Sequence, residues 1–176
     1  MAEFRTVAAN TVAEAAFLRL ERRLVEAPDG SVAERVVVVH PGAVAIVPLI
    51  DDDVLLFRQH RVPIGRSLLE IPAGKLDVPG EEPGATAVRE LEEEIGYTPG
   101  KLRHLTDLLT TPGFSDECIH IYVATDLTAV AARPTGIEEH HAEIVRMSLA
   151  DAVDMARRGA ITDAKTVVGL LLAAGR

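Results

Sequence analysis

The chain of 176 residues contains a single cysteine, Cys118, so it cannot form an intrachain disulfide. Low cysteine use of this kind is typical of proteins kept in a reducing cytosol, and we expect a cytoplasmic protein. No apolar run reaches the length of about 20 residues that a membrane-spanning helix needs. The first residues, MAEFRTVAAN, lack a basic region followed by an apolar one, so we expect no secretory signal.

Positive charge is also scarce in this sequence. The 18 Lys and Arg residues stand against 27 Asp and Glu residues, which leaves a formal net charge of −9 at pH 7. Broad binding to a nucleic-acid backbone needs a basic surface, so we expect no nucleic-acid partner. A single phosphorylated small molecule is still compatible with this charge, provided that metal ions screen the carboxylates.

The most informative stretch is residues 74–97, GKLDVPGEEPGATAVRELEEEIGY, which starts as a Gly/Pro-rich loop and continues as a short predicted helix. Pro83 suits the first helical turn, where the missing N–H of proline costs nothing. Gly96 suits the left-handed cap that closes many helices. Between these two residues, helical spacing predicts an apolar stripe of Val88, Leu91 and Ile95.

Three glutamates of this helix fall together on a largely different face: Glu90, Glu93 and Glu94. Like charges at this spacing each cost about 0.2–0.5 kcal/mol on a helix surface. The last helical turn, which holds Glu93 and Glu94, favours cations by about 0.3–1 kcal/mol per group. A bound divalent cation would remove both penalties. A solvated charge run is the alternative, but the loop, the cap and the two-sided helix together favour a metal site.

This stretch resembles the Nudix box, whose pattern is G-x5-E-x7-R-E-U-x-E-E-x-G-U, with U a bulky apolar residue. Residues 89–97, RELEEEIGY, fit its second half, and Glu81 stands eight positions before Arg89. Six residues, rather than five, separate Gly74 from Glu81. The loop is therefore one residue longer than the family pattern, and Glu81 is the ligand that the pattern fixes least.

The resemblance implies a Nudix fold and a hydrolase that uses Mg²⁺, or Mn²⁺, as its cofactor. The metal ligands that it implies are the carbonyl of Ala73 and the carboxylates of Glu81, Glu90, Glu93 and Glu94. Arg89 lies one helical turn before Glu93, and we expect it to orient these carboxylates rather than to contact substrate.

A second segment, TTPGFSDE at residues 110–117, resembles the PGFSDE-type loop of ADP-ribose pyrophosphatases. Pro112 occupies the position where that subfamily carries a characteristic proline. The resemblance implies that Glu117 is the general base, with Glu93 as the alternative, and that Phe114 contacts substrate. An ordinary hairpin loop with solvated acids is the competing interpretation.

Two further segments resemble the same subfamily: FRQHR at residues 57–61 and LEIPAG at residues 69–74. Arg61 matches an arginine that contacts the diphosphate or the adenine side of the substrate in that subfamily. Arg58 is assigned to substrate binding together with Arg61. Glu70 matches a glutamate that hydrogen-bonds adenine. A buried Glu–Arg structural pair is the alternative for Arg61 and Glu70.

The order of predicted elements is strands, one helix, more strands and then helices, which indicates an α+β or α/β fold with a mixed sheet between helices, an α/β/α sandwich. We expect strands at residues 43–50, 54–60, 68–72, 102–110, 118–125 and 144–149. We expect helices at residues 150–158 and 163–174, the second with Thr162 or Asp163 as its N-cap. Residues 131–141 are expected to form a loop, and residues 159–166, GAITDAKT, to have a structural role.

The N-terminal part, residues 1–40, is expected to form an appendage to a Nudix domain of residues 41–176. Residues 1–13 show little pattern and are expected to form an irregular or exposed start, while residues 17–40 read as a β-hairpin around Pro28-Asp29-Gly30. A lone hairpin is marginal in water and must pack on something. The resemblance implies a homodimer in which these strands are exchanged.

The expected reaction is hydrolysis of ADP-ribose, or a related ADP-sugar, to AMP and ribose 5-phosphate. One alternative is another nucleotide substrate, such as GDP-mannose, a UDP-sugar or a nucleoside triphosphate. An alternative of a different class is a non-catalytic domain that senses ADP-ribose. The histidines are expected to be ordinary strand or loop residues, including His140 and His141, which stand beside Glu138 and Glu139 and could otherwise suggest a metal cluster.

Overall fold

The computed structural model describes residues 3–133 and 137–175. The chain forms two compact units. The smaller unit contains the chain up to Gly42 together with Leu109–Cys118, and the larger unit contains Ala43–Leu108 and the chain from Ile119 onward.

The smaller unit is built on a three-stranded antiparallel sheet in the order β1-β2-β3. Its strands are β1 (Arg5–Ala15), β2 (Leu18–Glu26) and β3 (Val32–Val39). β2 and β3 form the predicted hairpin, with Gly30 in the left-handed region at φ 82°. Residues 1–13 were predicted to be irregular or exposed; the described part is exposed but regular, because β1 pairs with β2 along its length. Every residue of β1 is exposed, so the strand has no buried face to impose an alternating apolar pattern.

The larger unit contains a seven-stranded mixed sheet, in which strands run in the order β10-β5-β4-β9-β8, with β6 beside β5 and β7 beside β4. Its strands are β4 (Ala43–Ile50), β5 (Asp53–Arg61), β6 (Arg66–Glu70), β7 (Ala73–Lys75), β8 (Tyr97–Leu109), β9 (Cys118–Ala129) and β10 (Glu143–Ser148). β4 and β9 are parallel, whereas β4 is antiparallel to β5 and β7.

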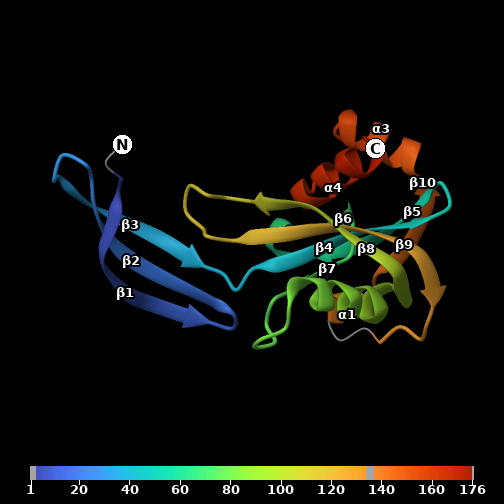
Figure 1. The fold of residues 1–176 in the computed structure, drawn as a ribbon, viewed down its shortest axis with the longest axis horizontal. Coiled ribbons are helices and arrows are strands. Elements are labelled where there is room, and N and C mark those ends of the chain that lie inside the picture. The colour runs from blue at the N-terminus through green and yellow to red at the C-terminus, as the bar shows by residue number, and fades with distance from the viewer. Residues whose placement is uncertain (1–2, 134–136, 176) are drawn as a thin grey trace. The chain divides into compact units, whose positions relative to one another are not determined.

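Helices cover both faces of this sheet (Figure 1). They are α1 (Pro83–Ile95) on one face and α3 (Leu149–Arg157) and α4 (Ala164–Ala174) on the other. β4 shows how the sequence produces two apolar layers. Val44 and Ile46 join the core cluster that contains Leu91 of α1, while Ala45 joins the cluster that contains Leu170 of α4. The predicted α/β/α sandwich with a mixed sheet is confirmed.

Both predicted ends of α1 are also confirmed. Pro83 occupies the start of the helix, and Gly96 closes it at φ 70°. A Cβ at Gly96 would lie 2.9 Å from the carbonyl oxygen of Val130. Both this close contact and the positive φ therefore favour glycine at this position. The buried stripe includes Leu91 and Ile95 as predicted, but Ala87 is buried where Val88 is only half-buried.

Some short elements depart from the sequence-based expectation. Residues 137–140 form the one-turn helix α2 (Ile137–His140), so the predicted loop over 131–141 is wrong there, and its residues 134–136 lie outside the described residues. A single turn is too short to produce a readable helical period. β7 and the 3₁₀ turn η1 (Val62–Ile64) were likewise not predicted. No helix within the described residues is long and apolar enough to cross a membrane.

Candidate active site

The acidic groups of the predicted metal site surround one guanidinium in the larger unit. Arg89 donates from Nη1 to Glu90 Oε1 at 2.7 Å and to Glu93 Oε2 at 3.2 Å. It also donates from Nη2 to Glu81 Oε2 at 3.2 Å. The extra residue in the preceding loop therefore does not remove Glu81 from the group that the helix presents.

Glu81 is held by a second donor from the first turn of α1. The hydroxyl of Thr86, which is fully buried, donates to Glu81 Oε2 at 2.7 Å. The hydrogen bonds from Arg89 and then from Thr86 lower the pKa of Glu81 below its usual value. Glu81 is therefore ionised at neutral pH and fixed in direction.

Arg89 is correspondingly fixed as a cation. Burial disfavours its charge, but the hydrogen bond with Glu81 and the charges of Glu90, Glu81 and Glu93 outweigh that effect and raise the pKa of Arg89. A permanent positive charge at this position offsets the repulsion among the carboxylates and keeps them oriented.

Glu94 departs from the expectation that the three helix glutamates share one face. Glu94 is buried, with an exposed fraction of 8%, whereas Glu90 and Glu93 are half-buried. Glu94 Oε2 accepts a hydrogen bond from the backbone N–H of Ala73 at 3.0 Å. The structure thus brings together Ala73 and Glu94, two of the residues predicted as metal ligands.

The surroundings of Gly74 account for the glycine at the start of the Nudix box. A Cβ added to Gly74 would lie 1.9 Å from the carboxyl carbon of Glu90, a distance at which the glutamate would have to move. The backbone of β7 can therefore approach the acidic side of α1 only because this position has no side chain.

The buried Glu70 forms an ion pair with the partly exposed Arg61 through two parallel hydrogen bonds. Arg61 Nε donates to Glu70 Oε1 at 2.7 Å, and Nη2 donates to Oε2 at 2.6 Å. Lys165 also donates to Glu70 Oε2, and Glu70 is only 2% exposed. Burial raises the pKa of Glu70, but Arg61 and Lys165 together reverse this effect and lower it. This geometry is compatible with the structural-pair alternative, and the assignment of Glu70 to adenine binding stays a prediction.

Hydrogen bonds of the same network connect the start of α4 to the end of β6, which precedes the Nudix box. Asp163, one of the two predicted N-cap residues, accepts from the Thr166 N–H at 3.0 Å and from Lys165 Nζ at 3.0 Å. The Thr166 hydroxyl accepts from the N–H of Ile71 at 2.9 Å. The expected structural role of GAITDAKT is thus supported by specific contacts, but Lys165 as partner of Glu70 was missed.

Arg58 lies in a different part of the larger unit. Its Nε is 3.2 Å from Glu143 Oε2, across the pairing of β5 with β10. It lines a cavity of about 290 Å³ together with His60, Ser67, Ile137, Glu138, His141 and Glu143. The predicted metal ligands do not belong to this lining.

Glu117 and Phe114 belong to the smaller unit. Glu117 accepts a hydrogen bond from the Thr110 hydroxyl, and its Oε1 lies 3.6 Å from His40 Nε2. His40 Nδ1 accepts from the N–H of Gly42 at 3.0 Å, which leaves Nε2 to carry the ring proton toward Glu117. Phe114 is 57% exposed, and its carbonyl accepts from the N–H of Val38 at 2.8 Å.

The NUDIX domain family model matches residues 39–168, which is most of the chain and includes the helix built around Arg89. The chain belongs to the NUDIX family. Two similar proteins are an ADP-ribose pyrophosphatase of Bacillus subtilis (strain 168) and one of Mycobacterium tuberculosis (strain ATCC 25618 / H37Rv). The first is 38% identical over 96% of this chain and 91% of its own length, and the second is 39% identical over 96% and 82%.

The chain is also similar in fold to a solved structure. The crystal structure of an ADP compounds hydrolase superposes with a TM-score of 0.83 and 28% sequence identity, and the match covers 98% of this chain and 93% of that one. The NUDIX fold expected from the box is therefore supported over nearly the whole chain.

The buried network around Glu70 leads to a stability prediction. Replacing Lys165 by Met removes one of two cations from a buried carboxylate, and we expect it to lower the free energy of unfolding by about 2–3 kcal/mol. Lys101→Met is the matched control, because Lys101 pairs with Asp126 at 2.9 Å but its side chain is 77% exposed. That control is expected to cost less than about 1 kcal/mol. Urea unfolding followed by circular dichroism measures both, and equal effects would contradict the assignment.

Proposed function

We propose that this NUDIX protein hydrolyses the diphosphate of ADP-ribose, or of a related ADP-sugar, to AMP and ribose 5-phosphate with Mg²⁺ as its metal. The observation that carries the proposal is the gathering of Glu81, Glu90 and Glu93 on Arg89, with Glu94 held beside Ala73. It occurs in a chain that aligns over 96% of its length with two ADP-ribose pyrophosphatases.

The donor set fits a hard divalent cation. The proposed ligands are four carboxylates and the carbonyl of Ala73, all oxygen donors of the kind that Mg²⁺ and Mn²⁺ prefer. Carboxylates outnumber the single guanidinium of Arg89, so the group has negative charge left to neutralise. When bound, such cations supply charge neutralisation for the diphosphate and activation of water.

The chain's own residues would divide the remaining tasks. Arg89 orients the carboxylates and does not need to contact substrate. Glu117 takes the proton of the attacking water, with Glu93 as the alternative base. The hydrogen bond from the Thr110 hydroxyl and the nearby imidazole of His40 would set the direction of the Glu117 carboxylate.

Substrate binding is assigned to four residues: Arg61, Glu70, Arg58 and Phe114. The side chain of Arg61 is 42% exposed although its inner edge pairs with Glu70, so its outer edge is available to a phosphate oxygen. In this proposal Glu70 positions Arg61, and its Oε1, which accepts from Arg61 Nε, also contacts the adenine amino group.

The function is tested by a substrate panel measured with Mg²⁺. We expect kcat/KM to be highest for ADP-ribose among ADP-ribose, GDP-mannose, a UDP-sugar and a nucleoside triphosphate. A preference for GDP-mannose or a UDP-sugar would keep the chemistry but replace the substrate. Binding of ADP-ribose without turnover of any compound would favour the non-catalytic sensor instead.

The metal assignment is tested separately by Glu93→Gln. This change keeps the size of the side chain but removes its charge, and we expect kcat for ADP-ribose to fall by about 100-fold or more at saturating Mg²⁺. Glu92→Gln is the matched control, because Glu92 occupies a variable position of the box on the same helix, and it should retain near wild-type kcat. A near-normal kcat for the Glu93 variant would refute the assignment, provided that its thermal unfolding is unchanged.

We also propose that the smaller unit mediates a homodimer. Exposed apolar side chains occur on all three of its strands: Val7, Val12, Leu18, Leu24, Val32 and Val36. A second copy would bury surface that a single sheet layer leaves in water. Size-exclusion chromatography with light scattering should return twice the chain mass of 18.9 kDa.

Charge placed on this sheet tests where the dimer forms. Combined Val12→Glu and Val36→Glu should shift the protein toward monomer, whereas Val62→Glu, at an exposed position of the larger unit, should not. A monomeric wild-type protein would refute dimerisation, and a dimer that survives the double substitution would refute this interface.

A further inference from the structure

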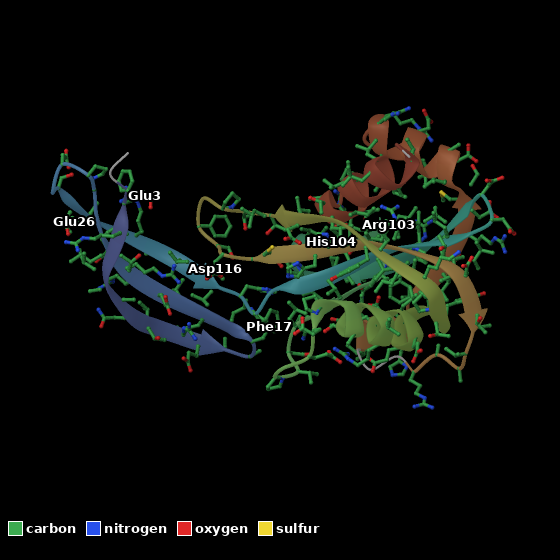
Figure 2. All side chains as sticks on the ribbon, in the orientation of Figure 1. Glu3, Phe17, Glu26, Arg103, His104 and Asp116 are labelled. Atoms are coloured by element: carbon green, nitrogen blue, oxygen red, sulfur yellow. The ribbon has the colours of Figure 1, made fainter. Side chains whose placement is uncertain are left out.

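Three side chains outside the NUDIX box converge on two neighbouring strands of the larger unit. His104 and Asp107 come from β8, where Figure 2 labels His104, and His120 comes from β9. His104 Nε2 and His120 Nδ1 each lie 2.7 Å from the same oxygen, Asp107 Oδ1. The three ligand atoms all lie within 4.8 Å of one another.

An irregularity in β8 creates this group. Leu102 packs against the core cluster at α1, while Leu105 and Leu108 both pack against the opposite cluster. Two residues three positions apart cannot share a face under strict alternation, so the alternation breaks once between them. The break returns Asp107 to the face that carries His104, which is why the sequence pattern alone gave no indication of the group.

The geometry of the three groups is restricted before any ion binds. The ring of His104 packs edge-on against Tyr122, with centroids 5.3 Å apart and an interplanar angle of 71°. His120 is half-buried. Hydrogen bonds from His120 and then His104 lower the pKa of Asp107, so its carboxylate is ionised.

We propose that His104, Asp107 and His120 bind a divalent transition-metal ion of the zinc class. Two imidazole nitrogens and one carboxylate oxygen are a recognised three-ligand set for such ions, with the remaining positions open to water. The ion would occupy the space between the three atoms and replace their shared hydrogen bonds with bonds of about 2.0–2.2 Å. Binding would link β8 to β9 and stabilise the larger unit.

This site differs in chemistry from the carboxylate group at α1. Mg²⁺ prefers oxygen ligands and retains its water, so imidazoles compete poorly for it. Zinc-class ions favour imidazole nitrogen. Excess Mg²⁺ competes for the carboxylates but not for the imidazoles, so Zn²⁺ binding is measured in its presence and assigned to β8 and β9 by the variants below.

The experiment is calorimetric titration of Zn²⁺ into the full-length protein in excess Mg²⁺. We expect one equivalent of Zn²⁺ to bind, and the affinity to fall by about tenfold or more in each of His104→Ala, Asp107→Asn and His120→Ala. Asp107→Asn keeps the shape of the side chain and so separates loss of a ligand from loss of packing. His60→Ala is the control, because His60 lies outside the group, and it should bind Zn²⁺ as the wild type does.

Thermal unfolding gives a second readout that does not depend on enzymatic activity. Zn²⁺ should raise the Tm of the wild type by mass action, and this rise should be absent or much reduced in the three variants, whose metal-free Tm checks that they fold. The proposal is overturned if the wild type binds no Zn²⁺ under these conditions. It is also overturned if the three variants bind Zn²⁺ as tightly as the wild type, because the ion would then bind elsewhere.

Discussion

The contact of one guanidinium with three carboxylates is the interaction on which the candidate site depends. Without Arg89, Glu81, Glu90 and Glu93 would repel one another, and Glu93 lies in the last turn of α1, where the helix dipole disfavours anions. The helix tolerates this arrangement because its other face is anchored in the core through Leu91, which is fully buried. Packing on one side of α1 therefore supplies the stability that permits an unfavourable charge distribution on the other.

A short segment between the two helix layers is held from both sides. On the side of α1, the N–H of Ala73 binds Glu94, and the absence of a side chain at Gly74 leaves room for Glu90. On the side of α4, the Thr166 hydroxyl accepts from the N–H of Ile71. Elements far apart in the chain thus fix the same few backbone atoms, which is how a fold sets the position of a carbonyl predicted to bind metal.

Local chemistry accounts for what could be predicted from the sequence. Pro83 and Gly96 mark the ends of α1 because each acts on its own backbone, and the apolar run of β4 is legible because both of its faces are buried. Other features depend on context that no local pattern contains. β1 is exposed throughout and therefore shows no period, and Lys165 meets Glu70 only after the sheet and α4 have packed.

The environment of Glu70 limits how adenine can be selected. Glu70 Oε2 accepts from both Arg61 and Lys165, whereas within the described residues Oε1 accepts only from Arg61, so an adenine amino group would bond to Glu70 through Oε1. A hydrogen bond to a charged group is worth about 1.5–3 kcal/mol, whereas displacing either cation would remove compensation for the burial of the Glu70 charge. A contact that leaves both cations in place is therefore favoured over one that displaces Arg61 or Lys165. Within the proposed function, Glu70 can therefore hold the guanidinium of Arg61 in place and still offer Oε1 to the base.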